Sequence, residues 1–168
     1  MIGSNTRDYK QDMGESLYRR SMYTLWKRAA PPASMDIFNA PCREVCTVRR
    51  ERTNTPLQAL VTLNDIQYVE SARFLAQRAI KEGGQAPESR IDFIARRVVA
   101  RPFKPAELIV IKRSLADLTN FYAAHSKEAS ELITTGETKP DAAIKPDTLA
   151  AWTMLTNQLM NLDEVLNK

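Results

Sequence analysis

The stretch RRERTNTPLQALVTLND, Arg49–Asp65, decides how this chain is organised, because an irregular basic segment changes there into a helix. Thr55 is a suitable N-cap residue, since its hydroxyl can accept a hydrogen bond from the first turn. Pro56 suits the first helical position, because a proline has no backbone N–H to leave unpaired. The stretch therefore predicts a short helix over residues 56–63.

Downstream of this junction, apolar residues recur at helical spacing. Asn64 and Asp65 break the first helix and cap a second one, which we expect to run to about Glu82, just before two glycines. Further stripes predict helices over residues 91–99, 105–122, 126–135 and 147–166, with Ser126 and Asp147 as caps of the last two. The pattern therefore predicts an all-α fold, a helical bundle of five or six helices.

Upstream of the junction we expect a polar lead-in over residues 1–15 and then a helical arm. The stretch SLYRRSMYTLWKRA, residues 16–29, can place its apolar residues on one side of a helix, and two prolines end it. Residues 33–55 show no helical period, so we expect an irregular Arg-rich segment that is functional or held by side-chain contacts. The predicted organisation is an arm with this segment, residues 1–55, and a helical bundle, residues 56–168.

Composition excludes several classes of protein. Five glycines and the absence of Asn-Gly or Asp-Gly turns argue against a β-rich fold. No apolar run is long enough to span a bilayer, and the polar first residues carry no secretory signal. The chain is therefore expected to be cytoplasmic, or to be a piece of a longer protein with its signal further upstream.

Four arginines in the irregular segment are the leading candidates for a binding function. They are Arg43, Arg49, Arg50 and Arg52. Guanidinium groups hold phosphate, sulfate or carboxylate through paired hydrogen bonds, and the helix N-terminus at Thr55 would add positive potential. The alternative is a structural latch, in which the arginines bind carboxylates and helix C-termini. The interleaving of Glu44 and Glu51 favours the latch.

Polar residues on both sides of the short helix complete the motif. They are Thr53, Asn54, Thr55 and Gln58 before or within its first turn, and Asn64 and Asp65 after it. Such residues close turns and satisfy backbone N–H groups, and ligand binding is the alternative role. Nucleic-acid binding is disfavoured, because only Phe38 supplies an aromatic ring near the basic residues.

The sequence assigns no catalytic residue and no metal site. Cys42 and Cys46 do not form a haem-attachment motif, and a disulfide between them would need an oxidising compartment, so we expect two separate thiols. The single histidine, His125, is expected to be solvated or to cap a helix, which leaves no ligand set for zinc. Asp163 and Glu164 point about 100° apart on a helix and are expected at a solvated helix end.

Three segments resemble a known family. They are RRSMYTLWKRAAPPASMDIFNAP, REVCTVRRERTNTPLQALVTLND and GETKPDAAIKPDTLAAWTMLTNQLMNLDEVLNK, which stand in the order and at the spacing of the C-terminal part of a domain-of-unknown-function family, number 1553, found in large planctomycete-type proteins. The resemblance runs from about Asn5 to Lys168. Its most specific block is Thr53–Leu60, and Asn161–Glu164 supports it.

The resemblance implies an accessory or interaction module of long exported proteins, many of which carry an upstream cytochrome c domain. It implies a periplasmic or otherwise extracytoplasmic location, and an upstream domain or subunit of the same system as partner. Haem c would belong to that upstream domain, so no cofactor is expected in this chain. With no haem motif or signal peptide, the chain is expected to be a C-terminal piece. The alternative is part of an enzyme that binds an anionic substrate, for example a sulfated glycan, through Arg49–Arg52.

Overall fold

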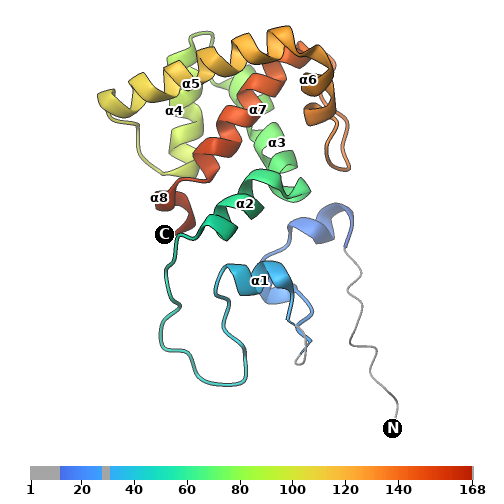
Figure 1. The fold of residues 1–168 in the computed structure, drawn as a ribbon, viewed down its shortest axis with the longest axis vertical. Helices are drawn as coiled ribbons and strands as arrows, with labels where there is room; N and C mark the ends of the chain where they lie inside the picture. The colour runs from blue at the N-terminus through green and yellow to red at the C-terminus, as the bar shows by residue number, and fades with distance from the viewer. Residues whose placement is uncertain (1–11, 28–30, 168) are drawn as a thin grey trace. The chain divides into compact units, whose positions relative to one another are not determined.

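The computed structural model describes residues 12–27 and 31–167. Eight α-helices and two short 3-10 helices make up the regular structure of these ranges, and no β-strand occurs in them, so the prediction of an all-α fold is confirmed (Figure 1). The chain divides into two compact units, Met1–Val61 and Thr62–Lys168, which are described separately here. The division falls inside a helix, whereas the predicted boundary lay before it, between residues 55 and 56. None of the described helices is long and apolar enough to cross a bilayer.

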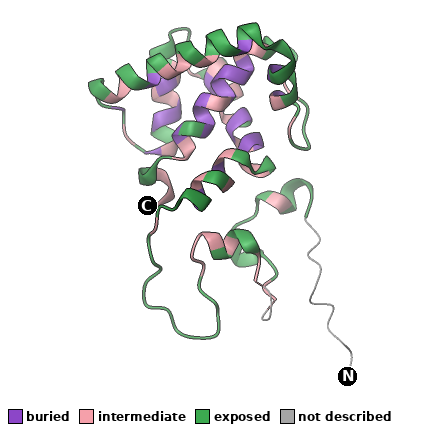
Figure 2. Ribbon diagram, viewed as in Figure 1, coloured by how far each residue is buried: buried purple, intermediate pink, exposed green. Residues whose placement is uncertain are grey.

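The second unit is a bundle of six helices and the end of a seventh. The helix α2 (Pro56–Asn64) enters it, followed by α3 (Ile66–Glu82), α4 (Pro87–Val98), α5 (Pro105–Ala124), α6 (Ser126–Ile133), α7 (Pro146–Met160) and α8 (Asp163–Leu166). The predicted helices over residues 56–63 and 66–82 are confirmed almost to the residue. The central element is α7, which packs against α3, α5 and α6. Buried residues accordingly concentrate along α7 and on the inner faces of α3 and α4 (Figure 2).

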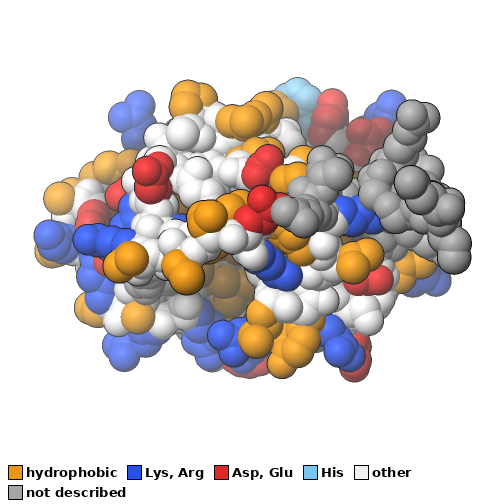
Figure 3. Space-filling model, turned by 90° about the horizontal axis from the view of Figure 1, so that it is seen from below, with side chains coloured by type: hydrophobic (Ala, Val, Ile, Leu, Met, Phe, Trp, Pro, Cys, Tyr) orange, Lys and Arg blue, Asp and Glu red, His pale blue; other side chains and the backbone are white. Residues whose placement is uncertain are grey.

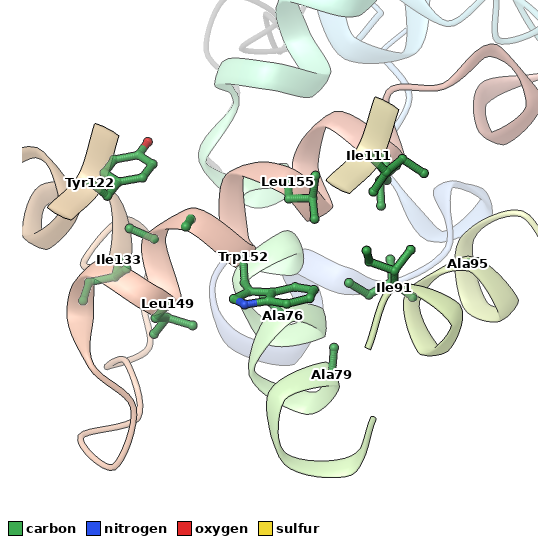
Figure 4. Packing of buried hydrophobic residues seen from close by; sticks show 14 of the residues in the cluster. Ala76, Ala79, Ile91, Ala95, Ile111, Tyr122, Ile133, Leu149, Trp152 and Leu155 are labelled. Carbon is green, nitrogen blue, oxygen red and sulfur yellow. The ribbon is translucent and has the colours of Figure 1, made fainter. Parts of the chain in front are cut away.

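Small side chains allow the central helices to approach closely. Ala72, Ala76 and Ala79 on α3 are fully buried, as are Ala150 and Ala151 on α7. Because interaxial distance depends on the side chains at the contact, these alanines bring the two helices together and leave room for larger residues beside them. The larger residues of this core are Ile91, Ile94, Ile111, Tyr122, Leu149, Trp152 and Leu155. Trp152 lies beside Ala76 of α3, whereas Tyr122 and Leu149 lie beside Ile133 of α6 (Figure 4).

Helix starts in the second unit differ from the predicted caps. The N-cap of α6 is His125 rather than Ser126, and the N-cap of α7 is Lys145 rather than Asp147. Pro146 occupies the first position of α7, so the helix begins ahead of Asp147, whose carboxylate accepts a bond from the neighbouring N–H instead. The predicted last helix is also broken, because α7 ends at Met160 and α8 resumes at Asp163.

In the first unit the predicted helical arm over residues 16–29 is wrong. The 3-10 helices η1 (Gly14–Tyr18) and η2 (Ser21–Tyr23) occupy its described part, and residues 28–30 lie outside the described residues, as does most of the predicted lead-in. Half of the apolar stripe that predicted the helix is open to solvent, with Met22 64% and Leu25 69% exposed, while Leu17 and Trp26 are half-buried. A helix of this length without a packed face is only marginally stable in water. The irregular segment contains one short helix that was not predicted, α1 (Ala33–Ile37).

Candidate functional site

The motif around Thr55 forms a reciprocal cap at the start of α2. The Thr55 hydroxyl accepts a hydrogen bond from the Gln58 backbone N–H (3.2 Å), and the Gln58 side-chain oxygen accepts one from the Thr55 N–H (2.9 Å). This is a capping box, in which the N-cap and third helical residues satisfy each other's backbone donors. Pro56 occupies the first helical position between them, as predicted.

The same glutamine fastens α2 to the preceding segment. Its Nε2 donates to the Ile37 carbonyl (2.8 Å), at the end of α1, and to the Thr53 hydroxyl (2.9 Å). That hydroxyl also accepts a bond from Asn39 Nδ2 (2.6 Å). Gln58 is 3% exposed and is the only buried side chain among the described residues of the first unit. The sequence carries a signal for the cap, since Thr-x-x-Gln is a capping-box pattern, but none for the contacts with Ile37 and Thr53.

Backbone geometry at Asn39 explains why the chain turns there. Asn39 follows α1 with a positive φ of 53°, the left-handed conformation that asparagine tolerates better than most residues. The Ala40 N–H donates to the Met35 carbonyl (2.9 Å) and the Asn39 N–H to the Asp36 carbonyl (3.0 Å). This pattern is a Schellman motif, which ends α1 and aims the Asn39 side chain at Thr53.

Two of the four arginines are held by the backbone of the same unit. Arg50 donates from Nε to the Asn39 carbonyl (3.0 Å) and from a terminal nitrogen to the Phe38 carbonyl, so its cation lies at the C-terminal end of α1. Arg43, with a positive φ of 62°, donates to the Ser21 carbonyl (3.3 Å) and lies 5.1 Å from the centre of the Trp26 ring. Contacts with a helix end are of the kind that a latch would make.

The other two arginines are open to solvent. Arg49 and Arg52 are exposed and form no ion pair or hydrogen bond within the described part of the chain. Asn54, beside them, is exposed as well. The N-terminus of α2 adds little to an anion site, because Pro56 has no N–H and that of Gln58 is bound by Thr55. The structure therefore does not gather the four guanidinium groups around one ligand position.

The last part of the motif is a helix boundary. Asn64 is the final residue of α2, and Asp65 is the N-cap of α3, where its carboxylate accepts a bond from the Gln67 N–H (2.9 Å). Burial, and to a smaller extent the charge of Asp65, raises the pKa of Tyr68 in the first turn of α3. The predicted break and cap at these two residues is confirmed.

The remaining sequence candidates lie apart from this motif. Cys42 and Cys46 are free thiols on the surface. His125 is exposed, with Nδ1 2.8 Å from the Phe121 carbonyl and its ring stacked on that of Phe121. Glu164 belongs to an ion-pair cluster described below. No group of three or more potential metal ligands occurs within residues 12–27 and 31–167.

A buried ion pair in the second unit was missed by the sequence reasoning. Glu70 and Arg73, one turn apart on α3, are each 1% exposed, and Arg73 donates to Glu70 (3.0 Å) and to the Ile133 carbonyl (2.6 Å). Thr138 closes the pair, because its N–H donates to Glu70 (2.9 Å) and its hydroxyl lies within 2.7 Å of Arg73. The sequence does contain a sign of this pair, because Glu70 and Arg73 fall on the same side of α3 as its buried apolar residues.

Close approach to this pair requires a glycine at position 136. Gly136 has a φ of 105°, and a Cβ atom placed there would lie 2.4 Å from the carboxyl carbon of Glu70. The loop after α6 can therefore cover the buried charges only because residue 136 has no side chain. Each hydrogen bond that the loop makes with the pair offsets part of the free-energy cost of removing its charges from water.

A second ion-pair cluster joins the start of α5 to α8. Arg101 donates to both carboxylate oxygens of Glu107 (2.9 and 3.0 Å) and to Glu164 (2.7 Å). The hydrogen bonds from Arg101, and then the one from the Lys104 backbone N–H, lower the pKa of Glu107 to about 2. Glu164 thus has a structural contact, whereas the carboxylate of its neighbour Asp163 accepts a hydrogen bond from Asn167 Nδ2 (2.6 Å).

Comparison with known proteins identifies one family. The model of a protein of unknown function, DUF1553, matches residues 2–115, which include the Thr53–Leu60 block and the whole capping-box motif but not Asn161–Glu164. No curated protein and no solved structure gives a significant match. Because the match covers more than half of the chain, this protein belongs to the DUF1553 family.

Proposed function

We propose that this chain is an accessory module that binds another domain or subunit of a large exported, cytochrome-associated system. The proposal rests on family membership and on one observation about the first unit. Among its described residues no apolar side chain is buried. A segment whose apolar side chains are at most half-buried gains little of the free energy that holds a domain together, so a partner is the natural source of further burial.

The uncovered surface has the composition of a binding site. Val45 is 69% exposed and Val48 fully exposed, and they lie in sequence beside the free Arg49 and Arg52. Arginine is enriched where proteins associate, since its guanidinium group supplies directed bonds, and apolar groups buried beside it add to the binding free energy. Hydrophobic and basic side chains are interspersed over the face shown in Figure 3.

The capping-box contacts give this surface a defined shape. Gln58, Thr53 and Asn39 tie α1 to α2, and Arg50 closes the end of α1. The segment between these ties, residues 41–49, is thereby presented as a loop with fixed ends. Fixing a loop before association lowers the entropy lost on binding. The structural latch thus fixes the ends of the loop that carries the proposed binding surface.

The test is to mix the purified chain with the cytochrome c-domain protein of the same organism and follow haem absorbance in sedimentation velocity. We expect a faster haem boundary when the chain is present. The double variant Val45→Ser/Val48→Ser should weaken association at least about tenfold. The control Ile109→Ser, which changes a residue 71% exposed on α5, should bind as the unchanged chain does. A haem boundary that does not shift, or equal loss with the control, would contradict the proposal.

The free state of Arg49 and Arg52 also favours a second candidate, binding of an anionic substrate such as a sulfated glycan. Isothermal titration with heparin oligosaccharides separates the two functions. Saturable binding that survives physiological salt and is lost in Arg49→Ala/Arg52→Ala would support the glycan. Binding that disappears at physiological salt in every variant would leave only general attraction between charges.

A further inference from the structure

A second stripe of residues runs along α5, beside the stripe that faces the core. The core stripe contains Leu108, Ile111, Leu115, Leu118 and Tyr122. The second stripe contains Val110, Ser114, Asp117 and Phe121, spaced by four, three and four residues, which is the spacing of a helix-pairing seam. These four residues, with Arg113, Leu118 and Gln158 of α7, line an open groove of about 510 Å³.

The ends of this second stripe are apolar and uncovered. Val110 is 67% exposed and Phe121 47% exposed, and they lie three turns apart on the same side of the helix. Between them Ser114 donates to Gln158 (2.9 Å), which connects the floor of the groove to α7. A helix laid along this groove would therefore contact an apolar residue at each end and polar groups in the middle.

The groove has one positive and one negative side chain, and both are without an ion-pair partner among the described residues. Arg113 and Asp117 are exposed, and neither forms an ion pair within the described part of the chain, although they stand one turn apart. Their neighbour Lys112, on another side of α5, is by contrast paired with Glu88 (2.7 Å). The groove thus offers a cation and an anion to an occupant whose charges are arranged in the reverse order.

We infer that the occupant of this groove is α5 of a second copy of the chain, packed antiparallel about a two-fold axis. Antiparallel pairing about a point between Leu115 and Ala116 places Val110 opposite Phe121 of the second copy and Ser114 opposite its Asp117. Arg113 then stands one residue away from the position directly opposite that Asp117, a step of about 1.5 Å along the helix that its long side chain can span. A two-fold axis repeats each contact, so two apolar and two ionic contacts form along the groove. The groove is self-complementary in charge, because Asp117 of the stripe meets Arg113 from the edge of the other groove.

The size of the contact sets the expected affinity. Five turns of helix span about 30 Å, and one helix pair buries less area than the ~1,600 Å² of a standard interface. We therefore expect a weak dimer, with a dissociation constant of order 10 to 100 μM. Only residues of the second unit take part, so this inference does not depend on the proposed function of the first unit.

Sedimentation velocity over 5 to 500 μM (roughly a hundredfold range around the expected affinity) tests the inference with charge reversals. Arg113→Asp and Asp117→Arg should each weaken the dimer at least about tenfold, because each places like charges opposite one another twice. Mixing the two variants should restore a dimer, since every contact between the two chains is then between opposite charges. Lys127→Asp on α6, 85% exposed, is the control and should dimerise normally.

Circular dichroism must show that each variant keeps the helix content of the unchanged chain. A monomer at all concentrations would overturn the inference, as would a dimer that neither single variant weakens. Failure of the mixture to associate while both single variants are folded monomers would overturn the antiparallel α5 pairing. Restoration in the mixture, with both single variants monomeric, would support the inference, because it requires Arg113 of one copy to meet Asp117 of the other.

Discussion

At the scale of single residues, Gln58 has contacts that its sequence context only partly indicates. The Thr-x-x-Gln spacing identifies it as the partner of Thr55 in a cap. The donation from its Nε2 to the Ile37 carbonyl depends on a segment 21 residues earlier in the chain, whose path the sequence does not reveal. The same limit applies to Arg50, because its partners are backbone carbonyls and carry no residue-type signal.

Replacing Gln58 with Ala should loosen α1 from α2 without unfolding the second unit. Two side-chain donations and the cap are lost, at roughly 0.5 to 1.5 kcal/mol each. Hydrogen exchange should then speed up at the Asn39 and Ala40 amides, which close the end of α1. Gln58→Glu is the matched variant, since it keeps the acceptor for the Thr55 N–H and removes both donors. An unchanged exchange rate in both variants would contradict the latch.

Gly136 and Gly84 form a natural pair of test and control. Both have a positive φ, 105° and 90°, so alanine is strained at either. At position 136 the new Cβ would also meet the Glu70 carboxylate, whereas at position 84 its nearest neighbour is Ser89 Cβ at 3.4 Å. Denaturant unfolding should show a loss of about 2 to 4 kcal/mol for Gly136→Ala and about 1 kcal/mol for Gly84→Ala. Equal losses would mean that the loop does not seal the buried pair.

Ala100 offers a substitution in the stabilising direction. It is exposed and has a φ of 60°, a left-handed conformation that costs an alanine roughly 1 to 2 kcal/mol. Glycine adopts this conformation freely but loses more entropy on folding, so Ala100→Gly should raise the free energy of unfolding by about 0.5 to 1 kcal/mol. Urea unfolding measures it. A less stable variant would show that residue 100 does not adopt this conformation in solution.

At the scale of elements, periodicity predicted the helices that bury a face and failed for those that do not. The α3, α5 and α7 helices each place a continuous apolar stripe against a neighbour, and the stripe fixes the helix. The 16–29 stretch has a comparable stripe, yet Met22 and Leu25 are exposed and the helix does not form. The spacing of apolar residues shows that a segment could form an amphipathic helix. Whether the helix forms depends on whether another element packs against its apolar face.

The ion-pair cluster that joins α5 to α8 should make stability depend on pH. The pKa of Glu107 falls from 4.5 to about 2 in the folded chain, so its contribution is present above about pH 4.5 and is lost as the pH falls towards 2. The melting temperature should therefore drop across that window. Glu107→Gln should melt at a lower temperature at pH 7 and show a smaller drop. An identical pH profile for both chains would rule out this cluster as the cause.

At the scale of the whole molecule, the two units differ in how they are stabilised. Every buried apolar residue of the described chain belongs to the second unit, from Val69 to Leu159. The first unit is held by hydrogen bonds around Gln58 and by Arg43 and Arg50, and its described apolar residues are exposed or half-buried. The sequence predicted an arm with an irregular segment, residues 1–55, and then a bundle, because helical periodicity begins at the capped helix. It could not predict which side chains would stay uncovered, since that depends on the path of the chain.

The most direct measurement of this division is hydrogen exchange of the isolated chain, read by mass spectrometry along the sequence. The account predicts slow exchange in α3, α4, α5 and α7, and exchange faster by at least a hundredfold in peptides covering residues 12–55. Protection of that N-terminal segment equal to that of α7 would contradict it. Such a result would mean that the first unit has a core of its own and needs no partner to cover its apolar residues.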